Sequence, residues 1–125
     1  MVVVPAQVRE EIAAHAREEI PNEACGLLLL DGDTAVRYVR GTNATASPYR
    51  FSLYIDPVEW ADLGETEYEQ AVVHSHPSSP PHPSRTDVEN VGLWEGRPYL
   101  IYSVHQDALS GWTIDGGDIT PLELT

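Results

Sequence analysis

The chain has no lysine, only one cysteine and no long apolar run. All seven basic residues are arginines, set against 20 acidic residues, so the formal net charge is −13. One thiol cannot form an internal disulfide, and it excludes every metal site that needs several cysteines. The longest apolar stretch, residues 24–30, is far shorter than the roughly 20 residues that cross a membrane.

These absences limit the possible partners and location. A strongly acidic surface repels phosphate groups, so we expect neither nucleic acid nor an anionic membrane as a partner. Residues 1–5 are apolar but lack the basic lead and the length of a signal peptide, and we therefore expect a cytoplasmic protein. A length of 125 residues is typical of one domain, so we expect a single domain over 1–125.

Hydrophobic periodicity predicts an α+β fold with a mixed sheet and helices packed on it. Apolar residues recur at a spacing of four in the first expected helix, whereas residues 24–30 are a continuous apolar run, typical of a buried strand. The expected helices are 5–20, 57–70 and 84–94. The expected strands are 2–4, 24–30, 34–40, 51–55, 71–76, 99–104, 109–114 and 119–124, with extended loops at 41–48 and 77–83.

Three of the five histidines fall within nine residues, and two of them lie at the end of an expected strand. His74 and His76 are two apart, so their side chains share one face with Cα atoms about 6.8 Å apart. Two imidazoles at this offset can converge on one metal ion. If Ser84 begins a helix after the proline-rich loop, Asp87 lies in the first turn and can face the histidines. Two imidazoles and one carboxylate leave one position of a tetrahedral zinc site open for water.

Each of these residues also has an ordinary structural interpretation. An isolated H-x-H pair is more often structural than metal-binding, and Ser84 with Asp87 is also a helix-capping pattern. We expect His82 to be exposed to solvent or to substrate, and we do not assign it as a ligand. His15 and His105 are expected to be surface residues.

Considered together, the residues from His74 to Asp87 form the pattern H-x-H-x7-S-x-x-D, which resembles the motif of the JAMM (MPN-plus) metalloproteases. Members of that family also have a glutamate upstream, and Glu23 in the segment E-A-C-G-L-L matches it. Asn43-x-x-x-Ser47-Pro48 and Phe51-x-x-x-x-Asp56-Pro57 are similar to segments of the short prokaryotic, Mec-like members. The resemblance extends from residue 5 to residue 124.

The resemblance implies a three-layer, cytidine-deaminase-like architecture, with a mixed central sheet between helices on both faces. It implies Zn2+ held by His74, His76 and Asp87, with Glu23 as general base and Ser84 as the hydrogen-bond donor to the oxyanion. The implied enzyme is a zinc metallopeptidase or isopeptidase. It would cleave after the C-terminal Gly-Gly of a ubiquitin-like or sulfur-carrier protein, and it would act as a monomer or homodimer.

Other interpretations remain open at this point. Cys25 follows the expected base and is either a nucleophile or, as we favour, a small buried core residue. The same fold could serve as a non-catalytic binding scaffold, although such scaffolds usually lose metal ligands. Two histidines and a carboxylate also form the site of mononuclear non-haem iron enzymes. A RadC-like protein is disfavoured by the negative charge, and a zinc deaminase is excluded by the missing cysteine pair.

Two surface features are candidates for substrate contact. Tyr49, Phe51, Tyr54 and Trp60 form an aromatic cluster that either supports the body of a carrier protein or belongs to the core. The acidic residues between 59 and 69 either steer a basic partner or form a solvated helix face.

Overall fold

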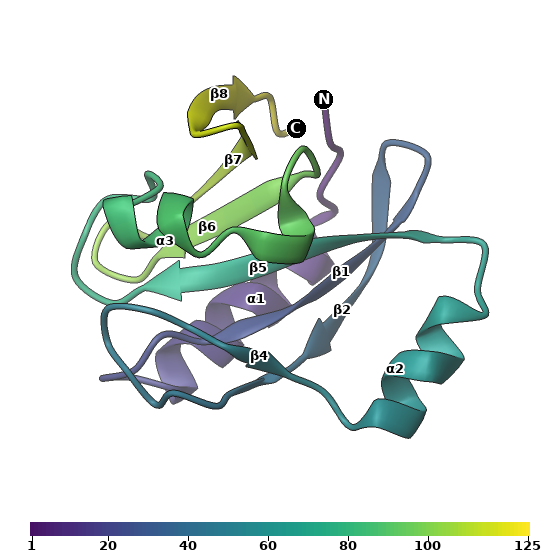
Figure 1. Ribbon diagram of the computed structural model, residues 1–125, viewed down its shortest axis with the longest axis horizontal. Coiled ribbons are helices and arrows are strands. Elements are labelled where there is room, and N and C mark those ends of the chain that lie inside the picture. Colours follow the sequence, from purple (N-terminus) through teal and green to yellow (C-terminus); the bar gives the residue numbers. More distant parts are fainter.

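A six-stranded mixed sheet forms the centre of the computed structural model, which describes residues 1–125 (Figure 1). The strand order is β2-β1-β5-β6-β7-β8, and a separate two-stranded sheet pairs β3 with β4. The strands are β1 (Cys25–Asp31), β2 (Thr34–Arg40), β3 (Thr42–Asn43), β4 (Leu53–Tyr54), β5 (Glu69–His76), β6 (Tyr99–Ser103), β7 (Ala108–Asp115) and β8 (Asp118–Leu122). The helices are α1 (Ala6–Glu18), α2 (Pro57–Gly64), α3 (Arg85–Glu89) and the 3-10 turn η1 (Gly92–Trp94).

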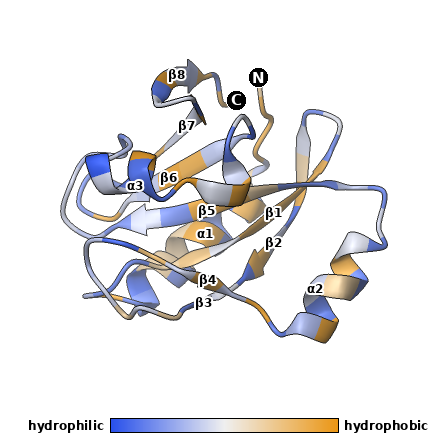
Figure 2. Ribbon diagram, in the orientation of Figure 1, coloured by the Kyte–Doolittle hydropathy of each residue, from blue (hydrophilic) through white to orange (hydrophobic).

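Helices cover both faces of the sheet, so the expected α+β architecture with three layers is confirmed. On one face, α1 packs on alternate residues of β1 and β5, including Leu28 and Val73. On the opposite face, side chains of α2, α3 and η1 pack over Leu27, Val72 and Ile101. Because β1 is buried on both sides, its residues are almost continuously apolar, as the hydropathy colouring of Figure 2 shows.

The pairing of β5 with β6 is parallel, and every other pair in the large sheet is antiparallel. A parallel pair cannot be joined by a tight turn, so the chain must cross over one face between residues 77 and 98. This crossover contains the proline-rich loop, α3 and η1. It brings Ser84 and Asp87 back over the end of the strand that carries the two histidines.

Several expected elements are shorter in the structure than the periodicity predicts. The helix expected over 57–70 ends at Gly64, and the strand expected from 71 begins at Glu69. The helix expected over 84–94 ends at Glu89, and Gly92, whose φ of +54° is incompatible with a continuing α-helix, begins the separate 3-10 turn. Residues 2–4 form two isolated bridges, to Leu124 and Thr34, in place of a strand.

The placement of the remaining histidines corrects one expectation. His15 was expected at the surface, but it is buried, because it lies on the inward face of α1 and contacts the Tyr38 hydroxyl at 2.6 Å. His82 and His105 are exposed, as expected. None of the helices is both long and apolar enough to traverse a bilayer.

Candidate metal centre

The register between β1 and β5 places Glu23 beside the histidine pair. Cys25 lies opposite His74 in this antiparallel pair, so the residues just before β1 lie beside the carboxyl end of β5. The pairing extends one step further, because Ala24 donates its N–H to Ser75 Oγ at 2.8 Å and accepts from Ser75 N at 3.0 Å. Residues 51 positions apart in the chain are thereby held together by a β ladder.

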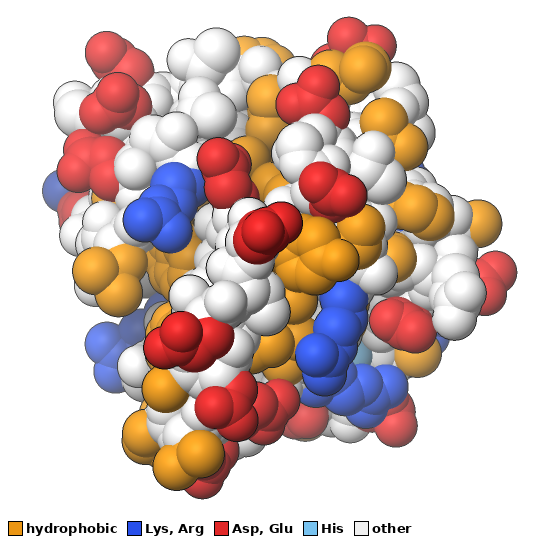
Figure 3. Space-filling view, turned by 90° about the vertical axis from the view of Figure 1, so that its right-hand side faces the viewer, with side chains coloured by type: hydrophobic (Ala, Val, Ile, Leu, Met, Phe, Trp, Pro, Cys, Tyr) orange, Lys and Arg blue, Asp and Glu red, His pale blue; other side chains and the backbone are white.

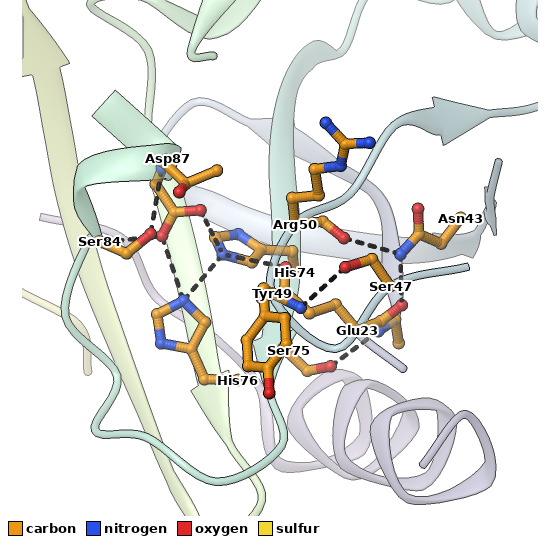
Figure 4. A network of polar contacts seen from close by, with 12 residues as sticks. Glu23, Asn43, Ser47, Tyr49, Arg50, His74, Ser75, His76, Ser84 and Asp87 are labelled. Carbon is orange, nitrogen blue, oxygen red and sulfur yellow. Dashed lines mark hydrogen bonds and ion pairs between the residues drawn. The ribbon is translucent and has the colours of Figure 1, made fainter. Parts of the chain in front are cut away.

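Three side chains converge at the end of β5 (Figure 4). The Nε2 atoms of His74 and His76 lie 3.2 Å apart. Asp87 Oδ2 is 3.1 Å from His76 Nε2, and Asp87 Oδ1 is 3.3 Å from His74 Nε2. All three side chains are almost completely buried. A hydrogen-bond network holds Asp87 in place, since Ser84 N donates to Oδ2 at 2.9 Å and Asp87 N donates to Ser84 Oγ at 3.1 Å.

These spacings fit a tetrahedral metal ion. Ligand atoms about 2.0–2.1 Å from zinc are separated from one another by about 3.3–3.4 Å in a regular tetrahedron. The chemistry of the donors fits as well. His76 Nδ1 faces the carbonyl oxygen of Pro80 at 2.8 Å, and because a carbonyl only accepts, Nδ1 carries the proton. With Nδ1 protonated, Nε2 of His76 is the nitrogen left to bind a metal ion, and without an ion it can carry a second proton toward Asp87.

Burial and charge move the pKa values of these groups in different directions. Burial lowers the pKa of His74. Burial also opposes charge on His76, but its hydrogen bonds to Asp87 and to the Pro80 carbonyl, together with the negative charges of Asp87 and Glu23, outweigh burial and raise its pKa. For Asp87, burial acts upward, yet the hydrogen bonds and charges of the histidines and the Ser84 N–H hold the pKa of the carboxyl far below its usual range. Asp87 is thus an ionised oxygen donor.

Glu23 is a second buried carboxyl at the site, and it lies in a different environment. Its Oε1 has no hydrogen-bond partner and lies 3.9 Å from His74 Nε2. Burial, together with the negative charge of Asp87, raises the pKa of Glu23 to about 8. Ligand atoms of Glu23, His74 and His76 lie within 4.8 Å of one another, so Glu23 is a competing ligand on distance alone. Asp87 differs from Glu23 in that it is nearer to both histidines and is ionised.

Aromatic rings orient His74 where hydrogen bonds do not. The ring of Phe51 stacks on His74 at 4.5 Å, and Tyr99 meets it edge-on at 5.3 Å. His74 Nδ1 is buried without a partner. Phe51 and Trp60 are half-buried, whereas Tyr49 and Tyr54 are exposed, so the aromatic cluster expected from the sequence is divided between core and surface.

The sequence predicts five site residues, and all of them lie close together in the structure. Glu23, His74, His76 and Asp87 surround one point, and Ser84 caps the helix that carries Asp87. Cys25 is completely buried, and burial raises the pKa of its thiol to about 12, as suits a core residue. Sequence reasoning missed Ser75, Tyr99 and the carbonyl of Pro80, which carry no motif of their own.

Most of the chain is similar to known proteins. A family model described as prokaryotic homologs of the JAB domain matches residues 5–115. The chain is 30% identical to the CysO-cysteine peptidase of Mycobacterium tuberculosis, over 96% of this chain and 87% of that protein. It is 40% identical to the desampylase of Haloferax volcanii, over 78% of this chain and 77% of that protein.

A solved structure shares the fold. The JAB1/MPN domain protein AF2198 from Archaeoglobus fulgidus superposes with a TM-score of 0.65 at 19% identity, covering 100% of this chain and 99% of that one. At that identity the likeness concerns the fold alone.

Proposed function

Since the chain belongs to the prokaryotic JAB branch of the JAMM (MPN-plus) family and is therefore a JAMM-type hydrolase, we propose that it is a zinc-dependent peptidase of ubiquitin-like or sulfur-carrier proteins. The proposed cleavage is at the peptide or isopeptide bond that follows a C-terminal Gly-Gly. Relatives named CysO-cysteine peptidase and desampylase support this substrate class.

In this proposal His74, His76 and Asp87 hold the metal. When bound, Zn2+ would lower the pKa of a coordinated water toward about 7 and polarise the scissile carbonyl. The two Nε2 atoms lie 3.2 Å apart and each faces one oxygen of Asp87, at 3.1 Å for His76 and 3.3 Å for His74, and these contacts support the ligand set. The hydrogen bond from His76 Nδ1 to Pro80 fixes the ring orientation that the set needs.

The observation that carries the proposal is the state of Glu23. Its Oε1 is buried, unpaired and aimed at the same point as the three ligands, so it is free to accept a proton. Without the metal the pKa of Glu23 is about 8, and a bound cation would lower it and favour the carboxylate form that takes a proton. Glu23 would take the proton of the attacking water at this oxygen and then deliver it to the nitrogen of the leaving amine.

Ser84 would act at the carbonyl oxygen of the scissile bond. Its Oγ already accepts the N–H of Asp87, so the hydroxyl proton remains available to donate. A donor fixed by a capping box needs little reorganisation when charge develops on that oxygen.

The neighbouring surface suits an extended, narrow substrate segment. A groove of about 310 Å³ adjoins Phe51, the residue that stacks on His74. Trp60, Leu93 and Trp94 also line it. Small residues such as glycine can pass such a wall without steric conflict, and main-chain pairing can provide affinity.

Mass spectrometry tests the function directly. Ubiquitin-fold carriers ending in Gly-Gly, extended by cysteine, by a short peptide or by an isopeptide-linked lysine, are incubated with zinc-loaded protein with and without chelator. We expect cleavage after the second glycine, abolished by the chelator and by Glu23→Gln. Metal analysis of the purified protein distinguishes zinc from iron, and intact substrates in all three series would favour a binding scaffold.

A further inference from the structure

The loop between β3 and β4, residues 44–52, closes against the metal centre on the side of Glu23. Phe51 of this loop stacks on His74 at 4.5 Å. Ser47 of the same loop accepts the backbone N–H of Glu23 through its carbonyl at 2.9 Å. The loop therefore contacts both a candidate ligand and the candidate base.

Asn43, at the start of this loop, uses its whole side-chain amide to organise these contacts (Figure 4). Its Nδ2 donates to the carbonyl of Glu23 at 3.1 Å and to the carbonyl of Arg50 at 3.0 Å. Its Oδ1 accepts from Thr45 N at 3.1 Å, Thr45 Oγ1 at 2.7 Å and Ser52 N at 3.0 Å. The reversed amide would place Nδ2 against two N–H donors and Oδ1 against two carbonyls, so these contacts fix its orientation.

Glu23 depends on these loop contacts because it lies outside the β ladder. β1 begins at Cys25, and the last ladder-like contacts belong to Ala24 and Ser75. Both backbone polar groups of Glu23 are bound by the loop: its carbonyl by Asn43 and its N–H by Ser47. The side chain of Glu23 adds no such anchor, since Oε1 has no hydrogen-bond partner.

We propose that Asn43 is a positioning residue for Glu23, which it connects to the 44–52 loop so that the Glu23 carboxylate and Phe51 are held together around His74. This inference rests on the proposed function, in which Glu23 moves the proton. A carboxylate displaced by about 1 Å loses one to two orders of magnitude in rate. The candidate metal ligands are carried by β5 and α3, so loss of Asn43 would reach them only through the stacking of Phe51 on His74.

A matched pair of variants tests the proposal. Asn43→Asp removes both Nδ2 donors but keeps an oxygen for Thr45 and Ser52, and Asn43→Ala excludes the added charge as the cause. The control, Thr45→Val, removes a hydroxyl that bonds to Asn43 Oδ1 and lies 3.4 Å from the Arg50 carbonyl, yet it leaves the bond to Glu23 intact. In the zinc-loaded enzyme we expect both Asn43 variants to lower kcat by about 10- to 100-fold, with KM and zinc content nearly unchanged. We expect Thr45→Val to keep kcat within about twofold of the wild type.

Amide hydrogen exchange gives a readout that does not depend on activity. Loss of the Asn43 donors should speed exchange of the Glu23 N–H by up to about tenfold, while the Val73 amide of the central strand β5 stays protected. Unchanged exchange at Glu23 in both Asn43 variants would overturn the proposal, as would equal kcat losses in Asn43→Asp and Thr45→Val. If wild-type protein cleaves no carrier, the proposed function fails, and the exchange measurement still decides whether Asn43 positions Glu23.

Discussion

Two buried carboxyls, Glu23 and Asp87, lie near His74 at the end of β5. Their surroundings shift their pKa values in opposite directions. Asp87 is paired with both imidazoles and with the Ser84 N–H, which favours its ionised form. Glu23 has no such partner on Oε1, and its pKa is raised to about 8 by burial and by the charge of Asp87. Two neighbouring carboxyls whose pKa values are shifted in opposite directions suit two different roles, in which one holds the metal and the other moves a proton.

Replacing Glu23 by glutamine tests this assignment of roles. The amide keeps the shape of the side chain but cannot take a proton, so we expect Glu23→Gln to retain stoichiometric zinc and to lose about 10²- to 10⁴-fold in rate. Zinc is measured by mass spectrometry and the rate with a Gly-Gly carrier. Glu65→Gln, at an exposed position, is the control and should behave as the wild type. Loss of zinc from Glu23→Gln would instead make Glu23 a ligand.

His15 makes the stability of the fold depend on pH at a place far from the metal centre. Burial lowers its pKa, and so does the charge of Arg40, while Glu18 and Glu19 act in the opposite direction. Its Nδ1 contacts the Tyr38 hydroxyl at 2.6 Å. The unfolded chain therefore binds a proton more readily than the folded one.

The sign of this dependence follows from linkage. Because the folded-state pKa lies below the unfolded value of about 6.5, the free energy of unfolding should fall as the pH drops below about 6.5. His15→Asn, which can keep a bond to Tyr38 but does not titrate, should show a shallower loss between pH 6.5 and 5. Urea unfolding of both proteins across this range is the measurement, and identical slopes would contradict the prediction.

At the scale of elements, short-range chemistry ended two helices earlier than their periodicity predicts. At the end of α2, Thr66 Oγ1 donates to the carbonyl of Leu63 at 2.8 Å. This bond satisfies one of the last carbonyls of the helix, which have no partner within it. The following residues then join β5, where Glu69 pairs with Leu30 of β1. Local capping thus ended α2 before the segment that pairs with β1.

A matched pair of glycine substitutions tests the division of the third expected helix. Gly92 has a φ of +54°, so Gly92→Ala should cost about 1 kcal/mol in the free energy of unfolding. Gly64 closes α2, and an added Cβ there meets no atom within 4 Å. Gly64→Ala should therefore raise stability by a few tenths to 1 kcal/mol. Chemical denaturation checks both, and the same sign in the two variants would count against this account.

At the scale of the whole molecule, the 20 acidic residues against seven arginines raise the question of how negative charge is distributed. On the face that carries α2, Figure 3 shows acidic side chains scattered and not gathered into one patch. The residues between 59 and 69 are not one helical face either, because α2 ends at Gly64 and Glu69 belongs to β5. This distribution favours the solvated-surface interpretation of that stretch over directed steering.

Metal binding should stabilise the whole fold, because the proposed ligands come from β5 and from α3, which lies in the crossover that follows it. Zinc at about 100 times its Kd should add about 2.7 kcal/mol to the free energy of unfolding and raise Tm by several degrees. Asp87→Ala should abolish this shift. His105→Ala, which removes an exposed histidine, should keep it in full. Differential scanning calorimetry with and without chelator is the test, and a full shift in Asp87→Ala would remove Asp87 from the ligand set.

The sequence alone determined the alternation of elements, the mixed sheet and the residues to be considered at the site. Local signals sufficed for this, because strand periodicity placed His74 and His76 on one face and a capping pattern placed Asp87 in the first turn of a helix. Glu23 was joined to them only through resemblance to a family, since no local rule relates residues 51 positions apart.

Only the tertiary structure decided how these groups meet. The β1–β5 register brings Glu23 to the histidines, and the parallel β5–β6 crossover returns Asp87 over them. The burial of His15 and the five contacts of Asn43 were likewise hidden, because each depends on partners supplied by distant or irregular parts of the chain. Pairing between strands and the path of a crossover are set by packing of the whole core, which local sequence patterns do not record.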